Sequence, residues 1–114
     1  AIVVSYHGGR VMDHMPGTAQ FLPEIANAVG GRIKVLADGG IREGIDILKM
    51  LALGADSSMI GRPICIAAFG AEQEGFSFYL QEKLNELKKA MILTGCGSID
   101  HIDPYIIFRK KGDR

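Results

Sequence analysis

The chain has 114 residues, a length that fits one domain with a hydrophobic core. Its 13 basic and 13 acidic residues balance, so the charge indicates neither a nucleic acid nor an anionic membrane as a partner. Hydrophobic residues make up 47% of the chain, yet no uninterrupted apolar run approaches the ~20 residues that a membrane span needs. The first residues lack the pattern of a signal peptide, and Cys65 and Cys96 fit no metal or redox spacing. We therefore expect a cytoplasmic protein whose two thiols are buried and free.

The first part of the chain predicts one strand and one helix. The apolar run at residues 2–4 is typical of a strand buried on both faces, and residues 5–10 follow it as a polar, glycine-rich loop. Apolar residues then recur at helical spacing from Phe21 to Val29, with Thr18 as the expected N-cap. The glycine pair at positions 30 and 31 is expected to end this helix.

The same alternation of strand and helix continues through the middle of the chain. Residues 33–37 predict the second strand, and residues 45–53 predict a helix that Gly54 ends. Residues 57–60 predict the third strand. Three strands alternating with helices indicate parallel strands joined by right-handed crossovers, which is the α/β class.

The last part of the chain is predicted to be mainly helical. A short apolar helix covers residues 64–69, and a longer helix covers residues 72–93, with glycines at 95 and 97 closing it. Residues 98–114 are interpreted as a docked segment that ends in a solvated charged tail containing Arg109, Lys110 and Lys111.

Two glycine–arginine loops each follow a predicted strand and open a predicted helix. The first contains Asp38-Gly39-Gly40-Ile41-Arg42, and the second is Gly61-Arg62-Pro63. Glycine lets the backbone approach a ligand closely, the start of a helix favours negative charge, and arginine adds a planar set of donors. We therefore predict that these loops are the two halves of one phosphate site.

The motifs together resemble the FMN-dependent α-hydroxy acid oxidases and dehydrogenases, which include glycolate oxidase, lactate oxidase and flavocytochrome lactate dehydrogenase. The matching segments are Val3-Val4-Ser5-Tyr6-His7-Gly8-Gly9-Arg10, Leu22-Pro23-Glu24-Ile25, Asp38-Gly39-Gly40-Ile41-Arg42, Gly44-Ile45-Asp46-Ile47-Leu48-Lys49, Ala52-Leu53-Gly54-Ala55 and Ile60-Gly61-Arg62-Pro63. The Ser-x-His-Gly-Gly-Arg loop is the most specific of them. The resemblance extends from Ala1 to about residue 100.

This resemblance implies a (β/α)₈ barrel with its active site at the carboxyl ends of the strands. Matched in order, the three predicted strands are the sixth, seventh and eighth of the barrel. Residues 1–114 are then the C-terminal part of the barrel domain, about three βα units, because a complete barrel takes about 250 residues. Three strands cannot close a barrel, so we expect further strands upstream of Ala1.

The resemblance also implies a role for each residue of the loops. His7 would be the base that takes a proton from a 2-hydroxy acid, (S)-configured and lactate-like, while a hydride or carbanion equivalent passes to FMN. Arg10 would hold the substrate carboxylate. The catalytic residues are therefore expected to be His7 and Arg10, and the residues that contact FMN are expected to be Ser5, His7, Gly8, Arg10, Asp38, Gly39, Gly40, Arg42, Gly61 and Arg62.

The sequence departs from the family in two respects. Tyr6 stands where the family usually has a small asparagine, and the family lysine near the reduced flavin is not among these residues. We therefore expect the 114-residue chain alone to be inactive. Two other functions stay open at this point: another FMN- or phosphate-binding barrel enzyme, such as an isomerase or a nucleotide dehydrogenase, or a non-catalytic half-barrel that associates with itself.

Simpler interpretations exist for several of these residues. Asp38 could cap the following helix, and Arg42 and Arg62 could be solvated surface charges. Asp13 and His14 could join His7 in a metal site, but no spacing supports one, and we expect no metal. The expected partners are a small 2-hydroxy acid and a second copy of the chain in a homo-oligomer, with neither nucleic acid nor membrane.

Overall fold

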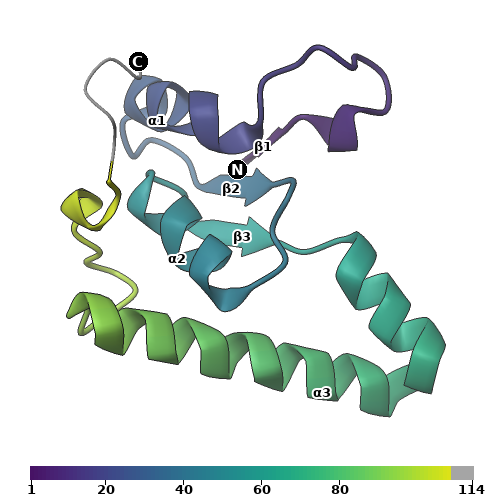
Figure 1. Cartoon of the computed structure of the whole chain (residues 1–114). Coiled ribbons are helices and arrows are strands. Elements are labelled where there is room, and N and C mark those ends of the chain that lie inside the picture. Colours follow the sequence, from purple (N-terminus) through teal and green to yellow (C-terminus); the bar gives the residue numbers. More distant parts are fainter. Residues whose placement is uncertain (109–114) are drawn as a thin grey trace.

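The structure, a computed structural model, describes residues 1–108 and contains three successive βα units (Figure 1). Its elements in chain order are β1 (Ile2–Ser5), the 3-10 turn η1 (His7–Gly9), α1 (Thr18–Val29), β2 (Val35–Asp38), α2 (Gly44–Ala52), β3 (Ser57–Met59), α3 (Arg62–Thr94) and the 3-10 turn η2 (Pro104–Ile106). The predicted alternation and all three strands are confirmed. The tail residues Arg109, Lys110 and Lys111 lie outside the described residues.

The three strands form one parallel sheet in the order β1-β2-β3. In its register Val4 lies opposite Ala37, which lies opposite Ser58, and Ser5 lies opposite Asp38, which lies opposite Met59. Successive residues of a strand point to opposite faces. These two rows therefore face opposite sides of the sheet, and the second row ends the strands at their carboxyl edge.

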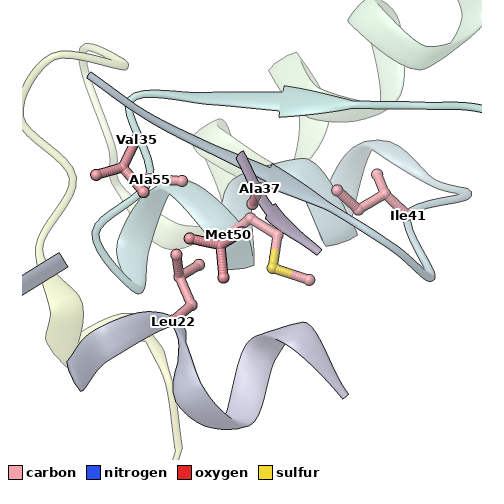
Figure 2. Packing of buried hydrophobic residues seen from close by; sticks show 7 residues of the cluster. Leu22, Val35, Ala37, Ile41, Met50 and Ala55 are labelled. Carbon is pink, nitrogen blue, oxygen red and sulfur yellow. The ribbon is translucent and has the colours of Figure 1, made fainter. Parts of the chain in front are cut away.

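Helices α1 and α2 cover the same face of the sheet. Their buried side chains Leu22 and Met50 pack against Val35 and Ala37 of the central strand, as Figure 2 shows. The cluster of buried residues consists of Val4, Leu22, Val35, Ala37, Ile41, Met50 and Ala55. Its apolar area, removed from water, is the main stabilising contribution to the fold.

The opposite face of the sheet is more open. Val3 of β1 points to this face and is 53% exposed, so the expectation of a strand buried on both faces is wrong for the described residues. Its physical reason is that both covering helices lie on the other side. The two cysteines also differ from expectation, because Cys65 is exposed and Cys96 is only partly buried; both are free.

The start of α1 differs from the sequence prediction. The N-cap is Gly17, whose backbone N–H donates to the side-chain oxygen of Gln20 at 2.8 Å. Thr18 is the first helical residue, and its hydroxyl instead donates to the carbonyl oxygen of Asp38 at 2.6 Å. A buried tertiary hydrogen bond therefore takes the hydroxyl that local capping would have used. The predicted end of α1 is confirmed, since Gly30 adopts the left-handed conformation at the C-cap with φ 58°.

Helix α3 bends sharply inside its length (Figure 1). The backbone is non-helical at Ala71 and Glu72, so the two predicted helices correspond to the two arms of this one element. The second arm packs along α2, and Gly95 closes it in the left-handed conformation. Of the helices within residues 1–108, none combines the length and apolar character that a membrane crossing requires.

Candidate functional site

A cavity of about 560 Å³ opens at the carboxyl ends of the three strands. In parallel α/β sheets this edge is where ligands bind. Its lining comes from the loops after β1, β2 and β3, and consists of His7, Gly8, Arg10, Asp38, Gly39, Gly40, Ile41, Arg42, Met59, Gly61, Arg62, Pro63 and Ile66. The structure therefore brings together, at one cavity, all the residues predicted from the sequence to form the site except Ser5.

Ser5 does not line the cavity but forms hydrogen bonds with two residues that do. Its hydroxyl donates to the Asp38 carboxylate at 2.6 Å and accepts the backbone N–H of His7 at 3.0 Å. One hydroxyl thus connects the end of β2 to the start of the His7 loop, which we define as residues 6–17.

The second to fourth residues of the His7 loop all lie in the left-handed region. His7 has φ 52°, Gly8 has φ 65° and Gly9 has φ 71°. Such a conformation costs a non-glycine residue of order 1–3 kcal/mol and is typical of functional sites. A Cβ atom at Gly8 would lie 3.7 Å from a terminal guanidinium nitrogen of Arg62, so this turn brings the His7 loop beside the loop after β3.

The first anion loop, defined as residues 38–44, is anchored at its beginning by neighbouring elements. The carboxylate of Asp38 accepts from Ser5, and its carbonyl oxygen accepts from Thr18. At Gly39, with φ 113°, an added Cβ atom would lie 2.4 Å from the ring of Tyr6. Glycine is required here both by the backbone conformation and by the ring packed against it.

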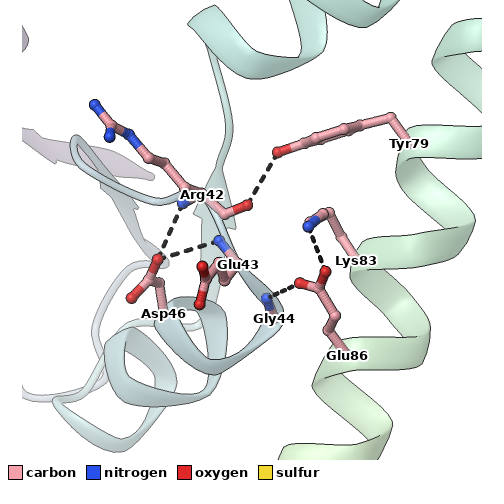
Figure 3. A network of polar contacts seen from close by, with 7 residues as sticks. All are labelled: Arg42, Glu43, Gly44, Asp46, Tyr79, Lys83 and Glu86. Carbon is pink, nitrogen blue, oxygen red and sulfur yellow. Dashed lines mark hydrogen bonds and ion pairs between the residues drawn. The ribbon is translucent and has the colours of Figure 1, made fainter.

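The backbone donors at the start of α2 are already occupied, as Figure 3 shows. The N–H groups of Arg42 and Glu43 both donate to the Asp46 carboxylate at 3.1 Å, and the N–H group of Gly44 donates to Glu86 at 2.7 Å. An incoming anion was expected at the helix-start donors, but the N–H groups of residues 42–44 bind the protein's own carboxylates. Arg42 can therefore serve an anion through its guanidinium, which lines the cavity.

The start of α3 is different. Gly61 is its N-cap, no side chain within residues 1–108 caps it, and Pro63 in its first turn contributes no N–H group. The N–H of Arg62 at the first helical position has no partner inside the helix. The second anion loop, defined as residues 61–63, thus keeps the positive end of a helix directed at the cavity.

The charge around the cavity fits a phosphate group. Arg10, Arg42 and Arg62 all line it, and none of them forms an ion pair with an acidic residue of the described chain. Within residues 1–108 no group of three metal-binding side chains comes together, and His7, Asp13 and His14 form no such cluster. The chemistry of these donors is that of an anion site.

Sequence reasoning missed two sets of residues. Ile41, Met59 and Ile66 add apolar lining to the cavity. The signal for Met59 was its position at the end of a strand, in register with Ser5 and Asp38. Tyr79, Lys83 and Glu86 support the first anion loop from α3, and nothing in their helical spacing distinguished them from ordinary surface residues.

Comparison with known proteins identifies strong similarity along the chain. A family model described as FMN-dependent dehydrogenase matches residues 1–109. An L-lactate dehydrogenase of Alcaligenes faecalis is 45% identical over 109 residues, which cover 96% of this chain and 29% of that protein. An L-lactate dehydrogenase of Caulobacter sp. (strain K31) is 46% identical over 106 residues, covering 93% and 28%.

The solved structures give the same result. Mandelate oxidase with (S)-2-phenylpropionate superposes with a TM-score of 0.86 at 44% identity, covering 90% of this chain and 31% of that one. Mandelate oxidase with benzoyl-formic acid superposes equally well, with the same identity and coverage. The chain therefore spans slightly less than a third of the length of the relatives it matches.

Proposed function

Because this chain belongs to the family of FMN-dependent dehydrogenases, we propose that the protein oxidises a lactate-like (S)-2-hydroxy acid to the 2-oxo acid. One observation carries the proposal: His7 and Arg10 open onto the same cavity as both anion loops. The residues that we propose as base, as carboxylate-binding group and as phosphate ligands thus lie around one space. The family match favours this reaction over the isomerase and nucleotide dehydrogenase alternatives.

The residues at the cavity fit FMN. Arg42 and Arg62, with the start of α3, would hold the phosphate, and Asp38 would accept from the ribityl hydroxyls through the carboxylate oxygen that Ser5 leaves available. The flavin, when bound, supplies an acceptor for the two electrons that leave the substrate.

In this proposal His7 and Arg10 act directly on the substrate. The two-pronged guanidinium of Arg10 binds the carboxylate and fixes the orientation of the hydroxyl-bearing carbon. The imidazole of His7 takes a proton from the substrate as the electrons leave. Ser5, by accepting the backbone N–H of His7, stabilises the left-handed backbone that carries the imidazole.

The substrate assignment rests on chemistry and on the relatives. The curated relatives are L-lactate dehydrogenases, and the structural neighbours are mandelate oxidases. Both names denote acids with a carboxylate beside a hydroxyl-bearing carbon. We propose the smaller acid, lactate, because both curated relatives compared above are named L-lactate dehydrogenase.

We further propose that the 114-residue chain alone is inactive and that the protein is a cytoplasmic homo-oligomer. For the inactivity and the self-association, support comes from the open face of the sheet, where Val3 is 53% exposed, and from the two outer strands, each of which has one unpaired edge within the described residues. A self-associating half-barrel is the corresponding alternative for the isolated chain, since association would also cover these edges.

The test is anaerobic mixing of the FMN-loaded protein that carries this chain with L-lactate, followed by flavin absorbance. We expect the flavin to be reduced, with L-lactate faster than glycolate or (S)-mandelate. His7→Gln should slow reduction by roughly 10²–10⁴-fold while flavin stays bound, because only the proton acceptor is removed.

His14→Gln is the matched control, since His14 belongs to the same loop but does not line the cavity. It should reduce flavin at the unaltered rate. Failure of all three acids to reduce the flavin would contradict the proposed reaction, and unchanged reduction in His7→Gln would contradict the role of His7.

A further inference from the structure

Three polar residues on one side of α3 face the start of α2 (Figure 3). They are Tyr79, Lys83 and Glu86, which we call the α3 latch. Each member contacts another member or the first anion loop, although about forty residues separate the two segments in the sequence. The latch lies outside the cavity, since none of its members lines it.

Glu86 caps α2 from outside. Its carboxylate accepts the N–H group of Gly44 at 2.7 Å and pairs with the ammonium of Lys83 at 2.5 Å. The approach is unusually close, because a Cβ atom at Gly44 would lie 2.2 Å from the backbone nitrogen of Leu87. Position 44 can therefore only be glycine if the two helices keep this separation.

Tyr79 binds the first anion loop at Arg42, two residues before Gly44. Its hydroxyl donates to the carbonyl oxygen of Arg42 at 3.2 Å, and the Lys83 ammonium lies 5.3 Å from the centre of its ring. Burial raises the pKa of the Tyr79 hydroxyl, so the group stays protonated and able to donate.

These contacts fix the backbone of Arg42 on both sides. Its N–H group donates to Asp46, its carbonyl oxygen accepts from Tyr79, and the next but one residue is bound by Glu86. Figure 3 shows the Arg42 guanidinium directed away from the latch, and Arg42 is one of the residues that line the cavity. The same helix α3 begins at Arg62 on the second anion loop. One bent helix thus contacts both anion loops.

We propose that Tyr79 and Glu86 are positioning residues for the phosphate half of the flavin site, acting through the backbone of Arg42. The proposal rests on the proposed function and deepens it. A latch that only packs α2 against α3 would contribute to stability alone. A positioning latch also determines how well the loop receives a phosphate group, independently of the flavin ring.

The comparison of FMN with riboflavin separates these two roles, because the two ligands differ only by the phosphate. The protein that carries this chain would be titrated with each ligand by flavin fluorescence, using Tyr79→Phe, Glu86→Ala and Glu86→Gln. We expect Tyr79→Phe and Glu86→Ala to weaken FMN binding about fivefold to tenfold, the effect of one lost hydrogen bond, with riboflavin affinity changed less than about twofold.

Glu86→Gln should restore most of the FMN affinity, because the amide oxygen can still accept from Gly44. Asn85→Ala is the control, since Asn85 lies on the same helix and its side chain bonds only Gln81 among the described residues. It should leave both affinities unchanged. Equal weakening of FMN and riboflavin in the latch variants would overturn the positioning role.

Hydrogen exchange of the ligand-free protein gives a readout that needs no flavin. The backbone amides of residues 40–44 should exchange faster in Tyr79→Phe and Glu86→Ala than in the unaltered protein. Unchanged exchange would overturn the inference. If the unaltered protein fails to bind FMN, the proposed function and the flavin assignment both fail. Faster exchange of the amides of residues 40–44 in the latch variants would then still support the contact of the latch with the backbone of Arg42.

Discussion

The His7 loop and the first anion loop open onto the same cavity but are held in different ways. The backbone of the first anion loop bonds Asp46 of α2 and Tyr79 and Glu86 of α3, besides the hydroxyl of Thr18. Within the described residues the His7 loop bonds itself and its immediate neighbours. The first anion loop is thus held by distant parts of this chain, whereas the loop that carries the imidazole is held locally.

The exposure of the His7 loop agrees with this difference. Val11 is 83% exposed and Met12 is 63% exposed, although both are apolar. Tyr6 is the point where the two loops meet, because its ring packs against Gly39. The first anion loop is therefore held by many contacts within residues 1–108, whereas the His7 loop has few contacts with distant residues of that range.

Gly44→Ala should lower the stability of the protein more than the other changes below. It should also free the first anion loop from α3, so that this loop, like the His7 loop, would be held mainly by local contacts. The added methyl group would overlap the backbone of α3 at Glu86 and Leu87, so α2 and α3 must separate. We expect a loss of about 3 kcal/mol in the free energy of unfolding, measured by urea denaturation.

Gly70→Ala provides the control for that variant. Gly70 lies in α3, and apart from its chain neighbours and the backbone of its own helix no atom of residues 1–108 lies within 4 Å of an added Cβ, so alanine there should be neutral or stabilising by up to about 1 kcal/mol. A Gly44→Ala protein as stable as Gly70→Ala would show that the close packing of the two helices does not hold the first anion loop.

Gly39→Ala tests the contact between the two loops and should have an intermediate effect. Alanine would meet the Tyr6 ring and would adopt φ 113° at a cost of its own, so we expect a loss of about 2 kcal/mol in a thermal or urea melt. Combining it with Tyr6→Ser relieves the clash but leaves the backbone strain. If the double variant recovers the full stability, the left-handed backbone at position 39 costs an alanine nothing. If it loses as much stability as Gly39→Ala alone, the Tyr6 ring moves aside at no cost.

A change of pH should have the smallest effect. The pKa of Glu86 is lowered from 4.5, chiefly by its hydrogen bond to Lys83 and then by the N–H of Gly44. A lowered carboxyl pKa contributes stability that is present above the ordinary value and is lost as the pH falls through the folded value. The latch should therefore weaken below about pH 4.5.

Lys83, the ion-pair partner of Glu86, is sensitive to pH at the alkaline end of the range. Its hydrogen bond to Glu86 raises the pKa of the ammonium above 10.5, so its contribution is lost only in alkali. Urea midpoints measured at about pH 7 and about pH 3.5 should fall less in Glu86→Gln than in the unaltered protein. Because Asp56 also titrates in acid, beside Lys34, an equal fall in both proteins would assign the acid sensitivity to that pair instead.

The sequence allowed the three strands, the glycine ends of the helices and nearly the whole cavity lining to be predicted. The strands, the helix ends and the two glycine–arginine loops follow from local patterns: apolar periodicity, glycine at left-handed positions, and loops that meet because parallel strands end at one edge. The places of His7, Gly8 and Arg10 in the site were implied by the family resemblance instead. Thr18 and the start of α2 were not predictable in this way. Their donors are satisfied by Asp38 and Glu86, which lie 20 and 42 residues away, and no local rule encodes such pairs.

The capping of α2 by a residue of α3 has a consequence for the order of folding during synthesis. Gly44 is made 42 residues before Glu86, the residue that caps it. At about 5–20 residues per second this interval is roughly 2–8 s, during which the sheet can form but α2 has no cap from α3. The first anion loop therefore gains its contacts with α3 after the strands that carry it have formed. A chaperone or protease that meets the nascent chain in that interval encounters this loop without its contacts to Tyr79 and Glu86.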